Sequence, residues 1–178
     1  MIALSPSEKM KAHVKEMADE IGALKGSTLK GAGNYCGLLG EMACRQYLSH
    51  RHKCDKIESY SFDLMVDGLL AEVKTKQTTV APRPEYIGNI HIESLHQKPD
   101  IYIFCRYNRD RDIIYLISWI ERDDFLSRAD QYKAGEIDPV TNFLLKKNSY
   151  CMAYGKMNKI ETIHDYLHTR NGINYAQQ

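Results

Sequence analysis

Residues 59–77 read SYSFDLMVDGLLAEVKTKQ, and this stretch decides how the centre of the chain folds. The pair Asp67-Gly68 predicts a two-residue β-hairpin turn, because both positions of such a turn require a positive φ. A turn at this place sets Asp63 directly across from Glu72. The predicted hairpin therefore brings two carboxylates together in the middle of a β-ribbon.

The same register separates apolar from charged side chains, because successive side chains of a strand point to opposite faces. One face is apolar throughout and carries Phe62, Leu64, Val66, Leu69, Ala71 and Val73. The other face carries Asp63, Met65, Leu70, Glu72 and Lys74. A slip of one residue would bury the charges, so the pattern fixes the register strongly.

Two like charges directly opposite each other cost roughly 0.2–1 kcal/mol even when exposed, so a positive group is expected between Asp63 and Glu72. Lys74 lies on the same face and would supply part of that charge. A divalent cation would supply more, because carboxylates, waters and a backbone carbonyl form the all-oxygen site that suits Mg²⁺ or Mn²⁺. The alternative is a solvated hairpin face with an ordinary Glu–Lys pair, which is common in antiparallel ribbons.

Length and composition bound the fold and the partners. A chain of 178 residues is expected to form one domain around one core, and 43% hydrophobic with 26% charged residues is typical of a globular protein. The net charge of +1 excludes a broad attraction to polyanions, so contact with nucleic acid would need a local basic surface. The five cysteines lack a C-x-x-C pair and indicate reduced thiols of a cytoplasmic protein. The sequence predicts neither a signal peptide nor a membrane span.

The order of predicted elements indicates an α/β fold, a central mixed β-sheet flanked by α-helices, in a single domain over residues 1–178. Ser5-Pro6-Ser7-Glu8 resembles a capping box with proline at the first helical position, and predicts that a helix begins there. Residues 1–24 are assigned to this N-terminal helix and its lead-in. The core covers 35–120, and a helix-strand-helix over 121–178 completes the fold. The remaining predictions are a helix over 35–49, a strand within 53–60, a long polar loop over 78–99, core strands over 100–108 and 112–120, a helix over 121–132, a strand over 150–154 and a helix over 161–169.

The spacing of Asp63, eight further residues and then Glu72-Val73-Lys74 resembles the active-site motif of the PD-(D/E)XK nuclease superfamily, which has the restriction-endonuclease-like fold. The resemblance covers about residues 35–120. Phe62 stands where the family's name has a proline, which leaves the subgroup open.

Two further residues take part in this resemblance. The family's preceding helix often supplies another acidic residue, and Glu41 in GLLGEMACRQYL fits that place. Gln77 resembles an additional polar position of several branches.

The resemblance implies a Mg²⁺-dependent (or Mn²⁺-dependent) deoxyribonuclease without an organic cofactor. Asp63, Glu72 and the carbonyl of Val73 would hold the metal, which would polarise the scissile phosphate and lower the pKa of a water. Lys74 would position the attacking water, and Glu41 would orient a water or bind a second ion. Catalytic residues are then Asp63, Glu72, Lys74, Glu41 and Gln77, and metal ligands are Asp63, Glu72, Val73 and Glu41.

DNA is the expected partner, and Lys30, Arg45 and Lys76 are the candidates for contacts with its phosphates, although each also reads as an ordinary solvated charge. A homodimer would supply the two active sites that cutting both strands commonly requires. Such a compact domain would suit a phage or mobile-element enzyme of DNA processing. The predicted loop 78–99 flanks the site and contains Arg83, Tyr86, His91 and His96, without a recognisable motif.

Other constellations are weaker. Asp67 is expected to make the turn and not to bind metal. His164 and His168 have a zinc-type spacing, but the sequence HDYLH has aspartate where that motif has glutamate, so a surface helix is favoured. His50, His52 and Cys54 alternate without a second ligand cluster. The alternative function is a catalytically inactive module of nuclease fold that binds nucleic acid or a protein partner, and a chance likeness of the hairpin is a third.

Overall fold

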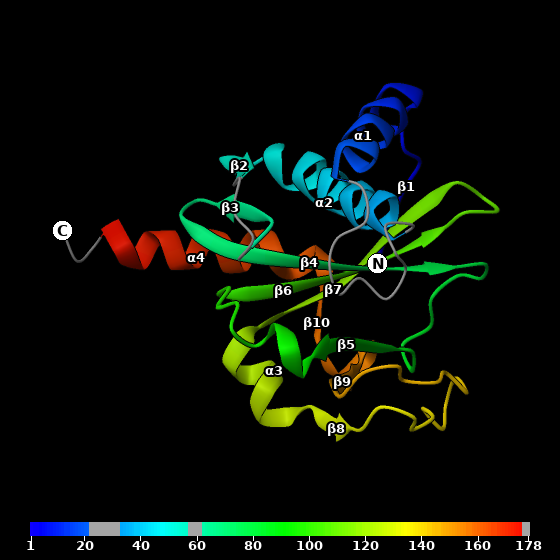
Figure 1. The fold of residues 1–178 in the computed structure, drawn as a ribbon. Helices are drawn as coiled ribbons and strands as arrows, with labels where there is room; N and C mark the ends of the chain where they lie inside the picture. The colour runs from blue at the N-terminus through cyan, green and yellow to red at the C-terminus, as the bar shows by residue number, and fades with distance from the viewer. Residues whose placement is uncertain (22–32, 57–61, 176–178) are drawn as a thin grey trace.

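The computed structural model describes residues 1–21, 33–56 and 62–175, and these form an α/β structure with two β-sheets (Figure 1). The main sheet is mixed, as predicted. Its strands lie in the order β1 (Ile2–Leu4), β7 (Ile113–Glu121), β6 (Ile101–Asn108), β4 (Leu69–Thr78), β3 (Leu64–Val66) and β2 (Cys54–Lys56), and β10 (Asn158–Lys159) also pairs with β7.

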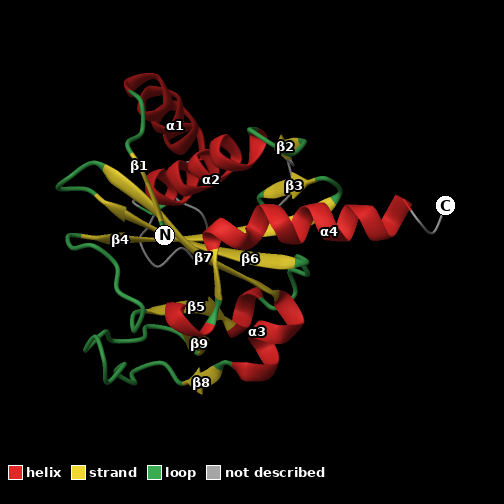
Figure 2. Cartoon of the chain, turned by 180° about the vertical axis from the view of Figure 1, so that it is seen from behind, coloured by secondary structure: helices red, strands yellow, loops and turns green. Residues whose placement is uncertain are grey.

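Helices α1 (Glu8–Ile21) and α2 (Asn34–Ser49) lie over one face of the main sheet (Figures 1 and 2). The apolar side of α2 packs on the inward residues of β3, β4, β6 and β7 in the larger of the hydrophobic cores. Helix α4 (Ile163–Tyr175) adds Ile163 and Leu167 to the same core. This layer anchors the back of the hairpin.

A second sheet lies on the opposite side of the main sheet (Figure 1). It consists of β5 (Ile87–His91), β9 (Ser149–Ala153) and β8 (Asp130–Tyr132), and α3 (Arg122–Arg128) lies beside it. Three short 3₁₀ turns complete the described elements: η1 (Ile92–Ser94), η2 (Tyr154–Lys156) and η3 (Ile160–Thr162). Gly88 permits the close approach of the sheets, because a Cβ there would lie 2.6 Å from Cδ1 of Phe104.

The hairpin has the predicted register, with Leu64 opposite Ala71 and the turn at Asp67 (φ 50°) and Gly68 (φ 85°). The predicted apolar face is confirmed, because all its strand residues from Leu64 to Val73 are buried in the larger core. Strand β4 is interior, antiparallel to β3 and parallel to β6. Asp63, however, lies in a bend just before β3 and not within a strand.

The first elements differ from the prediction in two ways. Strand β1 pairs with β7 and was not predicted. Helix α1 begins at Glu8, and the cap is Ser7, whose Oγ accepts the backbone N–H of Met10 at 3.2 Å. The prediction that Ser5 caps a helix starting at Pro6 is therefore wrong, because Pro6 precedes the cap and is buried.

Two middle elements were also predicted wrongly. The segment 78–99 is not one polar loop, because Ile87 and Ile90 are buried and β5 pairs with β9. The helix predicted over 121–132 ends at Arg128, and the next residues form β8, whose backbone pairs with β9. The strand predicted within 53–60 is present as β2, and residues 57–61 lie outside the described residues. No helix in the described ranges is long and apolar enough to cross a membrane.

Candidate active site

The alternation along β4 sends its charged side chains away from α2 and toward the second sheet. Glu72 is 4% exposed, and Nζ of Lys74 donates to its Oε1 at 2.5 Å. The other carboxylate oxygen, Oε2, is buried without a hydrogen-bond partner among the described residues. Such an oxygen is costly to bury unless a cation or a donor satisfies it.

Asp63 reaches the same place from the bend before β3. Its Oδ2 accepts the backbone N–H of Val73 at 2.7 Å, and its own N–H donates to the carbonyl of Ala71 at 3.1 Å. Burial raises the pKa of Asp63 well above its ordinary value, and the negative charges of Glu41 and Glu72 raise it further. The carboxylate of Asp63 thus lies close enough to that of Glu72 for the two to repel each other, as the predicted register implies.

Glu41 comes to this site because α2 lies unusually close to β4. A Cβ on Gly40 would lie 1.9 Å from Oγ1 of Thr75, so only glycine allows this contact. The next residue, Glu41, is half-buried and repels the carboxylate of Asp63. The fold therefore places Asp63 within electrostatic range of Glu72, in the same hairpin, and of Glu41, which comes from α2.

A hard divalent cation fits these residues in donor type and charge. The donors are carboxylate oxygens, one is buried without a partner, and Asp63 and Glu72 repel each other. Within the described ranges, however, no three Asp, Glu, His or Cys side chains converge on one point in the way a complete ligand set would. Water and the backbone would have to supply the other ligands.

The remaining predicted residues differ in where they lie relative to the carboxylates. Arg45 is half-buried one helical turn after Glu41. Gln77 is exposed, and the alternation of β4 puts it on the face opposite Glu72 and Lys74. Lys76 shares the face of Lys74. Lys30 lies outside the described residues.

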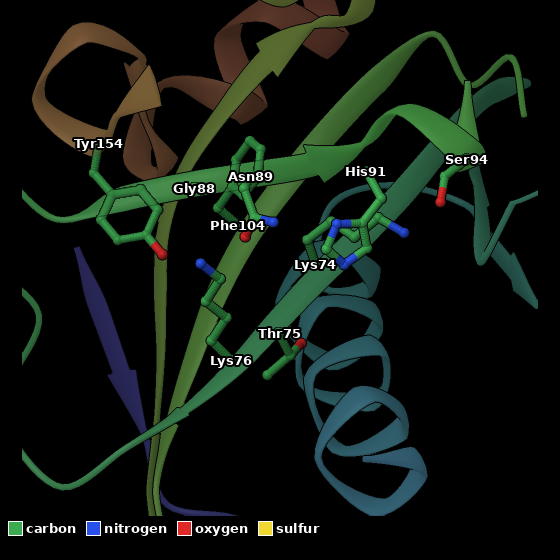
Figure 3. Close-up of a pocket in the computed structure, with 9 residues that line it drawn as sticks. All are labelled: Lys74, Thr75, Lys76, Gly88, Asn89, His91, Ser94, Phe104 and Tyr154. Carbon is green, nitrogen blue, oxygen red and sulfur yellow. The ribbon is translucent and has the colours of Figure 1, made fainter. Parts of the chain in front are cut away.

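A cavity of about 140 Å³ opens beside Lys74, between β4 and β5 (Figure 3). His91 lines it, and its Nδ1 lies 2.9 Å from Oγ of Ser149, which donates to the carbonyl of Lys147. Because that hydroxyl proton is already engaged, Nδ1 of His91 must donate, which leaves Nε2 as an acceptor. Burial first, and then Lys147, Lys74 and Lys76, lowers the pKa of His91.

The sequence offered little to single out His91. The sequence pattern places it in the predicted loop 78–99, among other polar residues. The signal that could have found it is the sequence IGNIH, a short strand that ends on the histidine.

Asp67 is a turn residue, as predicted, and it also organises a second polar cluster. Its carboxylate accepts the N–H of Lys53 at 2.9 Å and lies 2.7 Å from Nδ1 of His52. Nε2 of His52 is in turn 3.0 Å from Nδ1 of His164. Two histidines that sequence reasoning treated separately thus join α4 to the hairpin.

The five cysteines are free thiols, and Sγ of Cys44 lies 3.4 Å from Sγ of Cys105 behind the carboxylates.

Comparison with known proteins adds no relative: no family model, no curated protein and no solved structure matches the chain. The function therefore has to be argued from the site.

Proposed function

We propose that the chain is a divalent-metal-dependent deoxyribonuclease of the PD-(D/E)XK superfamily, with a restriction-endonuclease-like core. The observation that carries the proposal is the buried, unpartnered Oε2 of Glu72 beside Asp63, whose pKa is raised by burial and by neighbouring carboxylates. Buried carboxylates in this arrangement need a cation, and Lys74 supplies one charge to Glu72 alone. The mixed sheet with α2 packed behind the hairpin supports the proposed core.

The backbone contributes to the proposed metal site as well. In a strand, the N–H and C=O of one residue point to the same side. Because the N–H of Val73 points to Asp63, its carbonyl is expected to leave the strand toward Asp63 too. Asp63, Glu72 and this carbonyl would hold the cation, which would polarise the scissile phosphate and activate a water.

The position of Lys74 supports a role in the proposed hydrolytic step. Its ammonium group is held by Glu72 and also lines the cavity. From there it would orient the attacking water and offset the negative charge that develops on the phosphate. Glu41, on the other side of Asp63, would orient a water or bind a second ion.

Cleavage assays test this proposal. We expect the purified chain with Mg²⁺ or Mn²⁺ to cut at least one of plasmid, linear, single-stranded or junction DNA. Glu72→Gln and Lys74→Ala should each lower the rate by about 100-fold or more. Lys15→Ala, an exposed lysine of α1, is the control and should keep full activity. Cleavage that survives both site substitutions would contradict the assignment.

A catalytically inactive module of the same fold is the second candidate. One observation favours it: the described carboxylates do not converge as three ligands on one point. This candidate predicts salt-sensitive binding of DNA, or a stable protein partner, with no metal-dependent cleavage of any DNA in the panel.

A further inference from the structure

The charged side chains that line the cavity between β4 and β5 are basic. The residues around it that the structure describes include two lysines and a histidine but no carboxylate: Lys74, Thr75, Lys76, Gly88, Asn89, His91, Ser94, Phe104 and Tyr154. Figure 3 shows Lys76 extending from β4 toward Tyr154 and Asn89, with Lys74 and His91 further along the cavity. Its lining is suited to an anion.

Lys76 faces a second cation across the sheet. Parallel pairing of β4 with β6 sets Lys76 next to Arg106, and like charges so placed destabilise a sheet. Neither side chain forms a salt bridge with a carboxylate in the described part of the chain. Burial first, and then Arg106, lowers the pKa of Lys76 to about 8, although Cys151 and Asp138 act in the opposite direction.

Aromatic and backbone groups hold Arg106 in place, and its Nη2 donates to the carbonyl of Ile87 at 3.5 Å. Its Nε donates to the hydroxyl of Tyr154 at 3.1 Å, and its guanidinium carbon lies 5.1 Å from the ring centroid of Tyr86. Nζ of Lys76 is covered by Phe143, whose ring centroid is 4.6 Å away. Two cations are therefore held side by side without a salt bridge to a carboxylate of the described residues.

We infer that this cavity is a binding site for a phosphate group, distinct from the scissile phosphate beside Glu72 and Lys74. Lys76 supplies the main charge, Arg106 adds to the local field, and Asn89 supplies an amide donor from the opposite wall. A phosphate removes the repulsion between Lys76 and Arg106, which is the reason for its affinity. That the phosphate belongs to DNA rests on the proposed function, whereas the anion site itself rests on charge and burial.

Thermal unfolding of the metal-free full chain tests the site without any cleavage. We expect inorganic phosphate to raise the Tm more than potassium chloride of equal ionic strength. Lys76→Gln should weaken phosphate binding about tenfold or more, because a charge-assisted contact is lost. Lys159→Gln, which changes an exposed lysine of β10, is the matched control and should bind phosphate as the unaltered chain does.

The dependence on pH gives a second readout. Sulfate replaces phosphate as the probe here, since its charge stays constant. Sulfate binding should weaken as the pH rises through about 8, because the free site then loses the proton of Lys76. Asn89→Ala tests the opposite wall and should also weaken binding, so the site remains testable if Lys76→Gln does not fold. An unchanged response in Lys76→Gln, or no effect of phosphate beyond ionic strength, would overturn the inference.

Oligonucleotides identify the source of the phosphate. Binding that requires a terminal phosphate assigns the cavity to a strand end, and equal binding with and without it assigns the cavity to the DNA backbone. Either result supports the site, provided that Lys76→Gln weakens binding of the oligonucleotide. Inorganic phosphate that binds while no oligonucleotide does would keep the anion site and contradict the nucleic-acid source.

Discussion

At the scale of single residues, Asp63 is the carboxylate of the site whose ionised form is disfavoured by its surroundings. It lies in a bend, buried near Glu41 and Glu72, and holds the N–H of Val73. Since the native chain raises its pKa, the folded state binds a proton here that the unfolded state has already lost. Stability from this residue is therefore present near and below the ordinary pKa of about 3.9 and declines as the pH rises toward the native value.

Asp63→Asn should consequently stabilise the metal-free protein at neutral pH. Asparagine can still accept the N–H of Val73, but it removes the repulsion from Glu41 and Glu72. We expect a higher Tm in the presence of a chelator, by about 2–4 °C for each kcal/mol gained. The rise in Tm that Mn²⁺ gives the unaltered chain should disappear.

Asp19→Asn, at an exposed position of α1, serves as the control and should change neither value. A variant at Asp63 that is no more stable and still responds to Mn²⁺ would argue against a metal site at this residue.

At the scale of elements, the hairpin and the core strands could be predicted from sequence, because their signals are local. Asp67-Gly68 fixes the turn, and the alternation around it fixes which side chains face the core. The second sheet could not be predicted, because β5 and β9 are short and their pairing joins residues such as Ile87 and Ala153. Long-range pairing of this kind leaves little trace in a local pattern.

The candidate site likewise has a part that could be predicted from local sequence and a part that could not. The shared face of Glu72 and Lys74 follows from a period of two along one strand. The nearness of Glu41 to Asp63 depends instead on the packing of α2 against β4 at Gly40 and Thr75, which no spacing reveals.

Gly40→Ala should test that packing. The new Cβ would clash with Thr75, so we expect a loss of about 1–3 kcal/mol in the free energy of unfolding, measured with urea. Because α2 must move, cleavage should also fall. Gly37→Ala is the matched control, since nothing lies within 4 Å of its Cβ, and it should be neutral or stabilising. Equal effects of the two substitutions would show that the contact with Thr75 is not tight.

At the scale of the whole molecule, the cluster of Asp67, His52 and His164 connects parts of the chain that are far apart in sequence. These residues join the hairpin turn, the segment after α2 and the start of α4. The pKa of His164 is lowered, first by burial and then by His52, so the folded state resists its protonation. Its contribution to stability is present above the ordinary histidine pKa of about 6.5 and is lost as the pH falls below that value.

His164→Gln should flatten this part of the stability profile. We expect the unaltered chain to lose stability as the pH falls below about 6.5, and the variant to lose less, in urea unfolding followed over pH. His168→Gln, one turn along the same helix at an exposed position, should keep the original profile. A profile that His164→Gln leaves unchanged would show that other groups cause the loss.

Strand β4 also has a consequence for the ancestry of this protein. Ala71 and Val73 face the core, whereas the even-numbered residues from Glu72 to Lys76 face the site and the cavity. An insertion or deletion of one residue anywhere in this segment would exchange the two roles at once. Homologous chains can therefore vary in composition here far more readily than in length, and distant relatives should be sought by the constant interval from Glu72 to Lys76.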